Sequence, residues 1–475
     1  MNIYLILTLI LFIINFICAI SLVFIEKRDT TTIWAWLLIL FIFPFLGFIL
    51  YLSFGQNISK KKIFSKKAVI DKKKIKKILA DLNKDLHNEV AEEYIDLIKM
   101  NFSANDSIYT KKNEVKTYIN GEDKFRDLMD DIKNAKSFIN IEYYIFRFDN
   151  LGSKLIELLK EKIECGIEVR LLVDGMGSKS LTKDQIKYIK SCGIKFSVFF
   201  PNIAPYVNLR INYRNHRKIV VIDGNTGYVG GFNVGDEYIN RGKQFSFWRD
   251  THIKIVGAAA LELNKRFALD WEYAAKEDLY DIQLKKIQLS SKGDIGIQII
   301  SSGPDNMEEY IRNCYLKIIT NAKKNIFIQT PYLVLDHPMI EALKISAFSG
   351  VDVRIMVPNK ADHFFMAWAL SASIDSLIKS GVKFYKYKNG FIHSKTIVSD
   401  SSVCSIGTAN LDIRSFKLNF EINAIIYDSE VATNYEEIFL KDQTVCTLLT
   451  PEEYENRGHR IRILESISRL ISPIL

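Results

Sequence analysis

The sequence predicts an α/β protein built from two similar sandwich units in a pseudo-twofold arrangement, preceded by a two-helix transmembrane hairpin. Two long uncharged runs occupy the first 54 residues. The rest of the chain alternates apolar, strand-like runs with amphipathic stretches, and four short motifs occur in it twice, in the same order. At 475 residues, the chain is long enough for such a doubled body.

The amino-terminal segment, 1–56, is expected to form the membrane hairpin. Its apolar runs, 3–25 and 32–54, contain no charged residue, and each exceeds the ~20 residues that cross the hydrocarbon core as a helix. Pro44 and Gly47 are expected to break the second run, which a membrane helix tolerates if its neighbours satisfy the backbone. The alternative is a cleaved signal peptide over 1–25, but that run lacks a basic start and a second apolar run follows at once.

The positive charge is concentrated in one place. Residues 60–77 contain ten lysines and one aspartate, so they account for the whole net charge of +9 and leave the body neutral. This pattern disfavours nucleic acid as a partner, because nucleic-acid enzymes spread basic charge over their body. Positive charge stays in the cytoplasm, so the body, and with two spans also Met1, is predicted to be cytoplasmic. We interpret 57–110 as a basic juxtamembrane and helical connector that attracts anionic lipid.

Four landmarks mark the internal duplication, with offsets of 187, 184, 177 and 177 residues. They begin at Ala135, Gly166, His216 and Gly230 in the first unit, and at Ala322, Gly350, His393 and Gly407 in the second. The period is too long for a solenoid. We therefore expect one unit over 111–290 and another over 291–475, the second ending in an amphipathic tail that is either an interfacial helix or a packed terminal helix.

The third and fourth landmarks carry the chemistry. Each combines H-x-K-x4-D with a glycine seven residues later and an asparagine three residues after that, which gives two candidate sets: His216, Lys218, Asp223 and Asn233; His393, Lys395, Asp400 and Asn410. If the motif lies in a strand, its histidine and lysine share a face. A cleft with two imidazoles, two ammonium groups and two amides suits a tetrahedral anion. One histidine would attack phosphorus and the other would transfer protons, and the sequence leaves open which does which.

A histidine nucleophile needs its tautomer fixed, usually by a carboxylate. Asp250 and Glu421 follow the two motifs at similar distances and are predicted to orient the histidines, whereas Asp223 and Asp400 are expected to brace the motif loops. No metal and no cofactor is predicted, because the lysines supply positive charge and the six cysteines show no ligand spacing. Glu142 matches Gln329 in the other unit, so we expect no shared catalytic role for it.

The doubled motif resembles the phospholipase D superfamily. The apolar start, the Glu142-Tyr143-Tyr144 and Trp248-Arg249-Asp250 segments and the ending Arg469–Pro473 are similar to those of the bacterial cardiolipin synthases. This resemblance implies that His216, Lys218, Asp223, His393, Lys395 and Asp400 are the catalytic set. Two departures occur: Gly231 stands where many members have serine, and Thr408 keeps a hydroxyl that we expect to donate to phosphate.

The resemblance also implies the reaction. Phosphatidylglycerol acts as donor and as acceptor, a covalent phosphohistidine forms, and the products are cardiolipin and glycerol. A phosphatidylserine synthase or a hydrolytic phospholipase D of the same superfamily is the alternative, since no residue identifies the acceptor. The neutral body argues against a nuclease, and two complete motifs argue against a scaffold without activity. The oligomeric state is left open.

Overall fold

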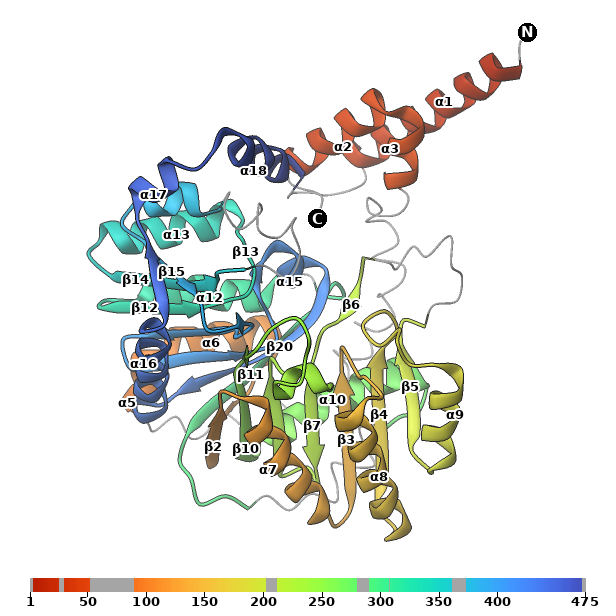
Figure 1. Ribbon diagram of the computed structural model, residues 1–475, viewed down its shortest axis with the longest axis vertical. Coiled ribbons are helices and arrows are strands. Elements are labelled where there is room, and N and C mark those ends of the chain that lie inside the picture. The colour runs from red at the N-terminus through yellow and green to blue at the C-terminus, as the bar shows by residue number, and fades with distance from the viewer. Residues whose placement is uncertain are drawn as a thin grey trace.

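The computed structural model describes residues 3–24, 30–51, 89–201, 212–279, 290–306, 308–360 and 373–471. The lysine-rich run 60–77 lies outside these ranges. The described chain forms a two-part α/β body from which the amino-terminal helices project (Figure 1).

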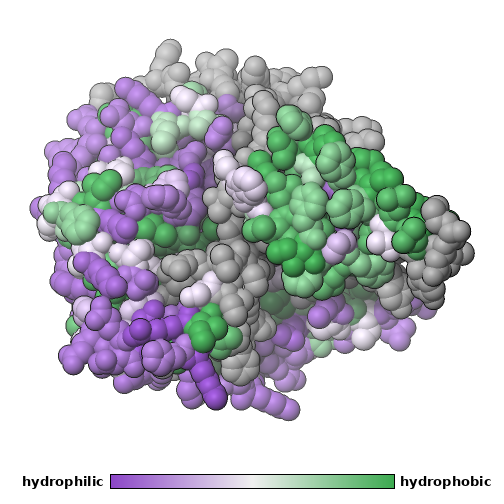
Figure 2. Space-filling model, turned by 90° about the horizontal axis from the view of Figure 1, so that it is seen from above, coloured by the Kyte–Doolittle hydropathy of each residue, from purple (hydrophilic) through white to green (hydrophobic). Residues whose placement is uncertain are grey.

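The amino-terminal segment contains α1 (Ile3–Phe24), α2 (Thr30–Ile42) and α3 (Pro44–Leu50). In the described part of the chain, α1 is the one helix long and apolar enough to cross a membrane. The expected second span, 32–54, is not one continuous helix. It breaks at Phe43 (φ −124°, ψ 69°), next to Pro44, because proline lacks an N–H and its ring clashes with the preceding turn. These helices expose a large hydrophobic surface, whereas most of the body visible from this side is hydrophilic (Figure 2).

The described part of the connector packs on the second unit, although it precedes the first. It contains α5 (Glu89–Glu93), α6 (Ile95–Asn105) and β1 (Tyr109–Thr110). Leu97 and Ile98 of α6 are buried in the second unit's core, and β1 pairs antiparallel with β11 (Gly296–Ser302). The segment that precedes the first unit in the sequence is therefore part of the second unit in space.

The first unit is a seven-stranded sheet with the order β2-β10-β8-β7-β3-β4-β5. Strands β3, β4 and β5 are parallel, and β7 runs antiparallel to β3. The elements are β2 (Asn113–Tyr118), α7 (Gly121–Lys133), β3 (Phe138–Tyr143), α8 (Asn150–Glu164), β4 (Glu168–Asp174), α9 (Lys183–Ser191), β5 (Lys195–Phe199), β6 (Arg214–Asn215), β7 (Ile219–Ile222), β8 (Thr226–Gly230), η3 (Asp236–Ile239), β9 (Trp248–Arg249), β10 (His252–Gly257) and α10 (Ala258–Ala275).

The second unit repeats this strand order as β11-β20-β18-β17-β12-β14-β15, with β1 and β21 added at its edges. The predicted duplication of an α/β unit is thus confirmed. The elements are α12 (Tyr310–Asn321), β12 (Asn325–Gln329), β13 (Leu333–Val334), α13 (His337–Phe348), β14 (Asp352–Pro358), β15 (Lys383–Tyr387), β16 (Phe391–Ile392), β17 (Thr396–Ser399), β18 (Val403–Gly407), β19 (Leu411–Asp412), α15 (Ile413–Lys417), β20 (Asn419–Tyr427), α16 (Ser429–Gln443), β21 (Cys446–Leu449), α17 (Pro451–Glu455) and α18 (His459–Ile471).

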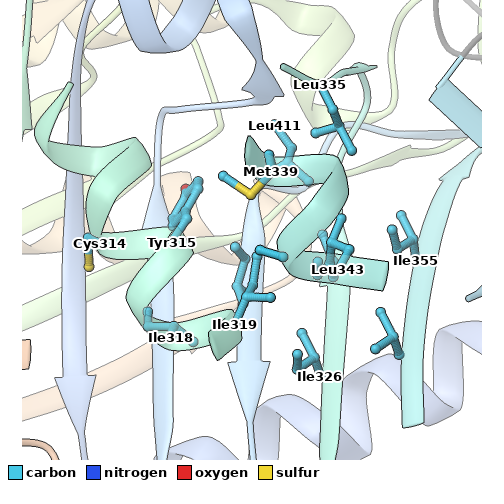
Figure 3. Close-up of a cluster of buried hydrophobic side chains, with 14 of the residues drawn as sticks. Cys314, Tyr315, Ile318, Ile319, Ile326, Leu335, Met339, Leu343, Ile355 and Leu411 are labelled. Atoms are coloured by element: carbon cyan, nitrogen blue, oxygen red, sulfur yellow. The ribbon is translucent and has the colours of Figure 1, made fainter. Parts of the chain in front are cut away.

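The inner faces of the two sheets share one core, and helices cover the outer faces. Ile219 and Val221 of β7 point into the shared core, whereas Val220 and Ile222 point into the core beneath α7 and α8. Burial on both faces explains why this strand is a continuous apolar run, as in sheets covered on both sides. In the second unit, α12 and α13 bury their apolar faces on β12 and β14 (Figure 3). Full burial of each such side chain contributes about 1.5–3 kcal/mol.

Candidate active site

Each H-x-K motif lies in a short link between two strands, just outside the regular strand in which it was expected. His216 follows β6 and His393 follows β16. The preceding strands pair across the two units, β6 with β20 and β16 with β9. The His216 N–H donates to Phe420 O (2.9 Å), and the His393 N–H donates to Arg249 O (2.7 Å). The backbone of each motif is therefore fixed by the other unit.

The same exchange holds for the carboxylates that face the histidines. His216 Nδ1 lies 3.0 Å from Glu421 Oε2, and His393 Nδ1 lies 2.6 Å from Asp250 Oδ2. Both carboxylates are fully buried. Each contacts the histidine of the opposite unit, so neither half of this arrangement is complete within one unit.

The two departures from the superfamily pattern are explained by these carboxylates. The Thr408 hydroxyl donates to Glu421 Oε2 (2.6 Å), so the expectation that it faces phosphate is wrong. Asn419 Nδ2 donates to the other oxygen of Glu421 (3.1 Å). In the first unit, a Cβ on Gly231 would lie 1.9 Å from Asp250 Oδ1. The shorter aspartate requires a residue without a side chain beside it, whereas the longer glutamate leaves room for a threonine.

Burial and the lysines set the charge of the histidines. Burial lowers the pKa of His393 to about 4, and nearby Lys395 adds to this effect against the opposing attraction of Asp250. Burial likewise lowers the pKa of His216, against the attraction of Glu421 and with help from Lys218 and Lys395. Both imidazoles are therefore neutral near pH 7, and a neutral imidazole is the form that can act as a nucleophile.

The lysines and carboxylates belong to the same electrostatic cluster. Burial lowers the pKa of Lys218 to about 7, and Lys395 contributes in the same direction. The Lys218 ammonium donates to His216 O (2.7 Å), and Lys395 Nζ lies 2.9 Å from His393 Nδ1. Although burial alone raises a carboxyl pKa, Lys395 and His393 outweigh it and lower the pKa of Asp250. Lys395 of the second motif also lowers the pKa of His216 in the first motif, so the charged groups of the two motifs influence one another.

Asp223 and Asp400 lie at the far end of their strands, away from the histidines. Both have a left-handed backbone, with φ of 55° and 54°. The Asp223 carboxylate accepts three backbone N–H groups, from residues 136–138, at 2.7–3.1 Å. Asp400 accepts those of residues 323–325 at 2.7–2.9 Å. These contacts tie the end of the motif strand to the start of the neighbouring strand.

The two asparagines differ in their surroundings. Asn233 Oδ1 accepts the Ile145 N–H (3.1 Å), and its Nδ2 donates to the Tyr238 hydroxyl (3.2 Å), so this amide braces the loop after β3. Asn410 Oδ1 is buried and has no hydrogen-bond partner within the described ranges. The equivalence seen in the sequence is therefore not matched by equal hydrogen bonding.

Further aromatic and charged side chains pack around the site. The Tyr144 ring packs edge-on against His216 (centroids 4.8 Å apart), and the Trp248 ring lies 5.2 Å from His393. Arg217, the middle residue of the first motif, is buried and forms an ion pair with Asp270 (2.6 Å). Burial and nearby Asp270 raise the pKa of Glu142 to about 8, while Asn215 Nδ2 donates to it (2.6 Å). Arg217 occupies an x position of the motif, and such a position gives no sequence signal for this ion pair.

Comparisons with known proteins identify relatives over nearly the whole chain. Residues 128–271 and 315–443 match the family described as cardiolipin synthase, PLD-like domain, and 13–56 match the one described as phospholipase D-nuclease N-terminal. The chain is 49% identical to a cardiolipin synthase of Clostridium perfringens (strain 13 / Type A), covering 95% of this chain and 96% of that one. It is 46% identical to the major cardiolipin synthase of Bacillus subtilis (strain 168) over the full length of both.

Among solved structures, the fold is similar to that of a phosphatidylserine synthase from Haemophilus influenzae Rd KW20. The TM-score is 0.59 at 14% identity, and the match covers 82% of this chain and all of that one. At this identity the likeness concerns the fold alone. Across the described ranges, no three or more His, Cys, Asp or Glu side chains gather where they could share a metal ion.

Proposed function

The chain belongs to the cardiolipin synthases of the phospholipase D superfamily, which are phosphatidyltransferases, and we propose that its two histidines perform the transfer in one site shared by both units. The observation that carries this proposal is the exchange of carboxylates, Glu421 to His216 and Asp250 to His393. The catalytic set would be His216, Lys218, His393 and Lys395, with Asp250 and Glu421 as positioning residues.

In the first half-reaction, the neutral imidazole of one histidine attacks phosphorus of phosphatidylglycerol. A P–N bond forms, the bond from phosphorus to the glycerol oxygen breaks, and the second histidine gives that oxygen its proton. The second imidazole takes up this proton from solvent when the substrate binds, because the negative charge of the bound phosphodiester favours the protonated form and raises the pKa. It releases a proton again when the product leaves. Lys218 and Lys395 stabilise the charge that builds on the phosphoryl oxygens.

In the second half-reaction, a terminal hydroxyl of another phosphatidylglycerol loses its proton to the second histidine and attacks phosphorus. The P–N bond breaks, cardiolipin leaves, and both histidines return to their starting states. Phosphatidylglycerol is thus donor and acceptor. The reaction is reversible because, overall, one phosphodiester P–O bond is broken and another of the same type is formed. Asp223 and Asp400 contribute by bracing the motif strands, and Asn410 is a candidate for the phosphate-binding amide.

The protein is membrane-associated, with the apolar helix α1 at its amino terminus. We place the body, divided into units 111–290 and 291–475, on the cytoplasmic side, because the lysine-rich run 60–77 joins it to the apolar segment. The same lysines would hold the site near anionic lipid, at about 1 kcal/mol for each lysine close to the surface.

The proposal is tested with purified protein in mixed micelles that contain phosphatidylglycerol as the sole phospholipid, with EDTA and without nucleotide. Cardiolipin and glycerol should appear in equal amounts, and His216→Ala or His393→Ala should each abolish both. His337→Ala is the matched control, because this side chain is exposed on α13. Phosphatidic acid in place of cardiolipin would identify water as the acceptor, and normal turnover by either histidine variant would refute the shared site.

A further inference from the structure

The second apolar run departs from the hairpin that the sequence predicts. We infer that α2 and α3 form a re-entrant loop, which enters the membrane from the side of the catalytic body, turns near the middle of the bilayer and returns to the same side. The crossing is then made by α1, and Met1 lies on the side opposite to the body.

The chain reverses direction at Phe43. The rings of Trp36 and Tyr51 are in edge-on contact, with centroids 5.6 Å apart. A straight helix would separate residues at this spacing by about 22 Å. A Cβ on Gly47 would lie 2.4 Å from Ile39 O, whereas a straight helix would place these residues about 12 Å apart. Both contacts require α3 to fold back along α2.

The reversal lies beside the middle of α1. Phe41, near the end of α2, contacts the ring of Phe12 (centroids 6.4 Å apart), and Asn15 of α1 reaches Pro44. Asn15 is nine residues from the end of α1 at Phe24, which is about 13 Å along a helix that is itself about 33 Å long. With 13 residues, α2 extends about 20 Å, which is too short to cross ~30 Å of hydrocarbon.

The carbonyl that the turn deprives of its helical partner is also satisfied, as the membrane interior demands. Pro44 has no N–H, so the carbonyl of Leu40 loses its helical partner. Asn15 Nδ2 donates to Leu40 O (3.3 Å) and to Pro44 O (3.0 Å), and Asn15 is only 2% exposed. Irregular backbone at membrane depth is tolerated where its polar groups find partners within the protein. Asn15 supplies such a partner here, while Phe43 and Phe45 at the turn are 57% and 70% exposed and present apolar side chains to the surroundings. An asparagine inside α1 and a proline opposite it thus form one paired feature.

The distribution of charge favours the same topology. Lys27 and Arg28 lie in the link between the two apolar runs. Two full spans would carry this link across the membrane, away from the lysines of 60–77. A re-entrant loop keeps all of these positive charges on one side, in agreement with the preference of short basic segments for the cytoplasm.

The test is the accessibility of one chosen cysteine at a time, in the full-length protein, to a membrane-impermeant maleimide, in intact protoplasts and in inverted vesicles. Cys165 is exposed on the body and reports its side. Asn2→Cys and Thr30→Cys are placed separately in a Cys165→Ser background, and both leave the charge pattern unchanged. The Cys165→Ser chain alone is the control for labelling of other cysteines.

We expect Asn2→Cys to be labelled from the side opposite to Cys165, and Thr30→Cys from the same side as Cys165. The reverse result for both would overturn the inference in favour of two spans. Labelling of all three from one side would overturn it as well, because α1 would not cross. Cardiolipin formation is measured on the same variants, so that a failure of the topology is distinguished from a failure of the proposed function.

Discussion

The fit between Gly231 and Asp250 makes a quantitative prediction about residues that flank the chemistry. In Gly231→Thr, a Cβ would lie 1.9 Å from Asp250 Oδ1, well inside the 3.0 Å limit of real contacts. The backbone is not the obstacle, since φ at this position is not positive. The carboxylate must therefore move by more than ~1 Å, and a displacement of that size costs about 10²-fold in rate, or about 2.7 kcal/mol.

Asp250 cannot move without releasing His393, because the same carboxylate lies 2.6 Å from its Nδ1. We therefore expect kcat for cardiolipin formation to fall about 100-fold in Gly231→Thr. The second unit shows how a threonine is accommodated, by pairing Thr408 with the longer Glu421. The double variant Gly231→Thr with Asp250→Glu copies that pair and should recover at least part of the lost activity.

Initial rates in phosphatidylglycerol micelles measure the effect, and Gly458→Thr is the control, because a Cβ there meets no atom within 4 Å. The reasoning is refuted if Gly231→Thr retains a kcat within about threefold of the parent, since ~1 Å of displacement should cost far more. The paired arrangement would also be contradicted if the loss of transition-state stabilisation in the double variant equals the sum of the losses in the two single variants.

Two further predictions concern pH and stability. The kcat/KM should fall as pH rises through about 7, because Lys218, with its pKa lowered to about 7, loses its proton there. The variant Lys218→Arg should move this fall to higher pH, since arginine stays protonated. An unchanged pH profile in that variant would exclude Lys218 as the source of the fall. Asp223→Asn should lower the free energy of unfolding by about 1–3 kcal/mol, because up to three backbone N–H groups lose a charged acceptor. The shift in the thermal unfolding midpoint of Asp223→Asn measures this loss of stability, and an unchanged midpoint would contradict the bracing role of Asp223.

The histidines, the lysines and the duplication were predictable because the same motifs occur in two copies in the sequence. His216 and His393 share a motif of fixed spacing, and repetition at one offset excludes chance. The identical order of strands in the two sheets follows from the same duplication. Asp250 and Glu421 were also predictable as orienting groups, because a nucleophilic histidine needs a carboxylate partner.

The sequence alone therefore determined the fold class, the candidate chemistry and the presence of an apolar segment, since each depends on composition, periodicity or local spacing. Tertiary structure decided which carboxylate faces which histidine, because β6 and β16 cross between the units and exchange the partners. It also decided that Thr408 holds Glu421, and that the run after Thr30 turns back at Phe43. These outcomes depend on contacts between residues distant in the chain, which hydrophobic pattern and spacing do not encode.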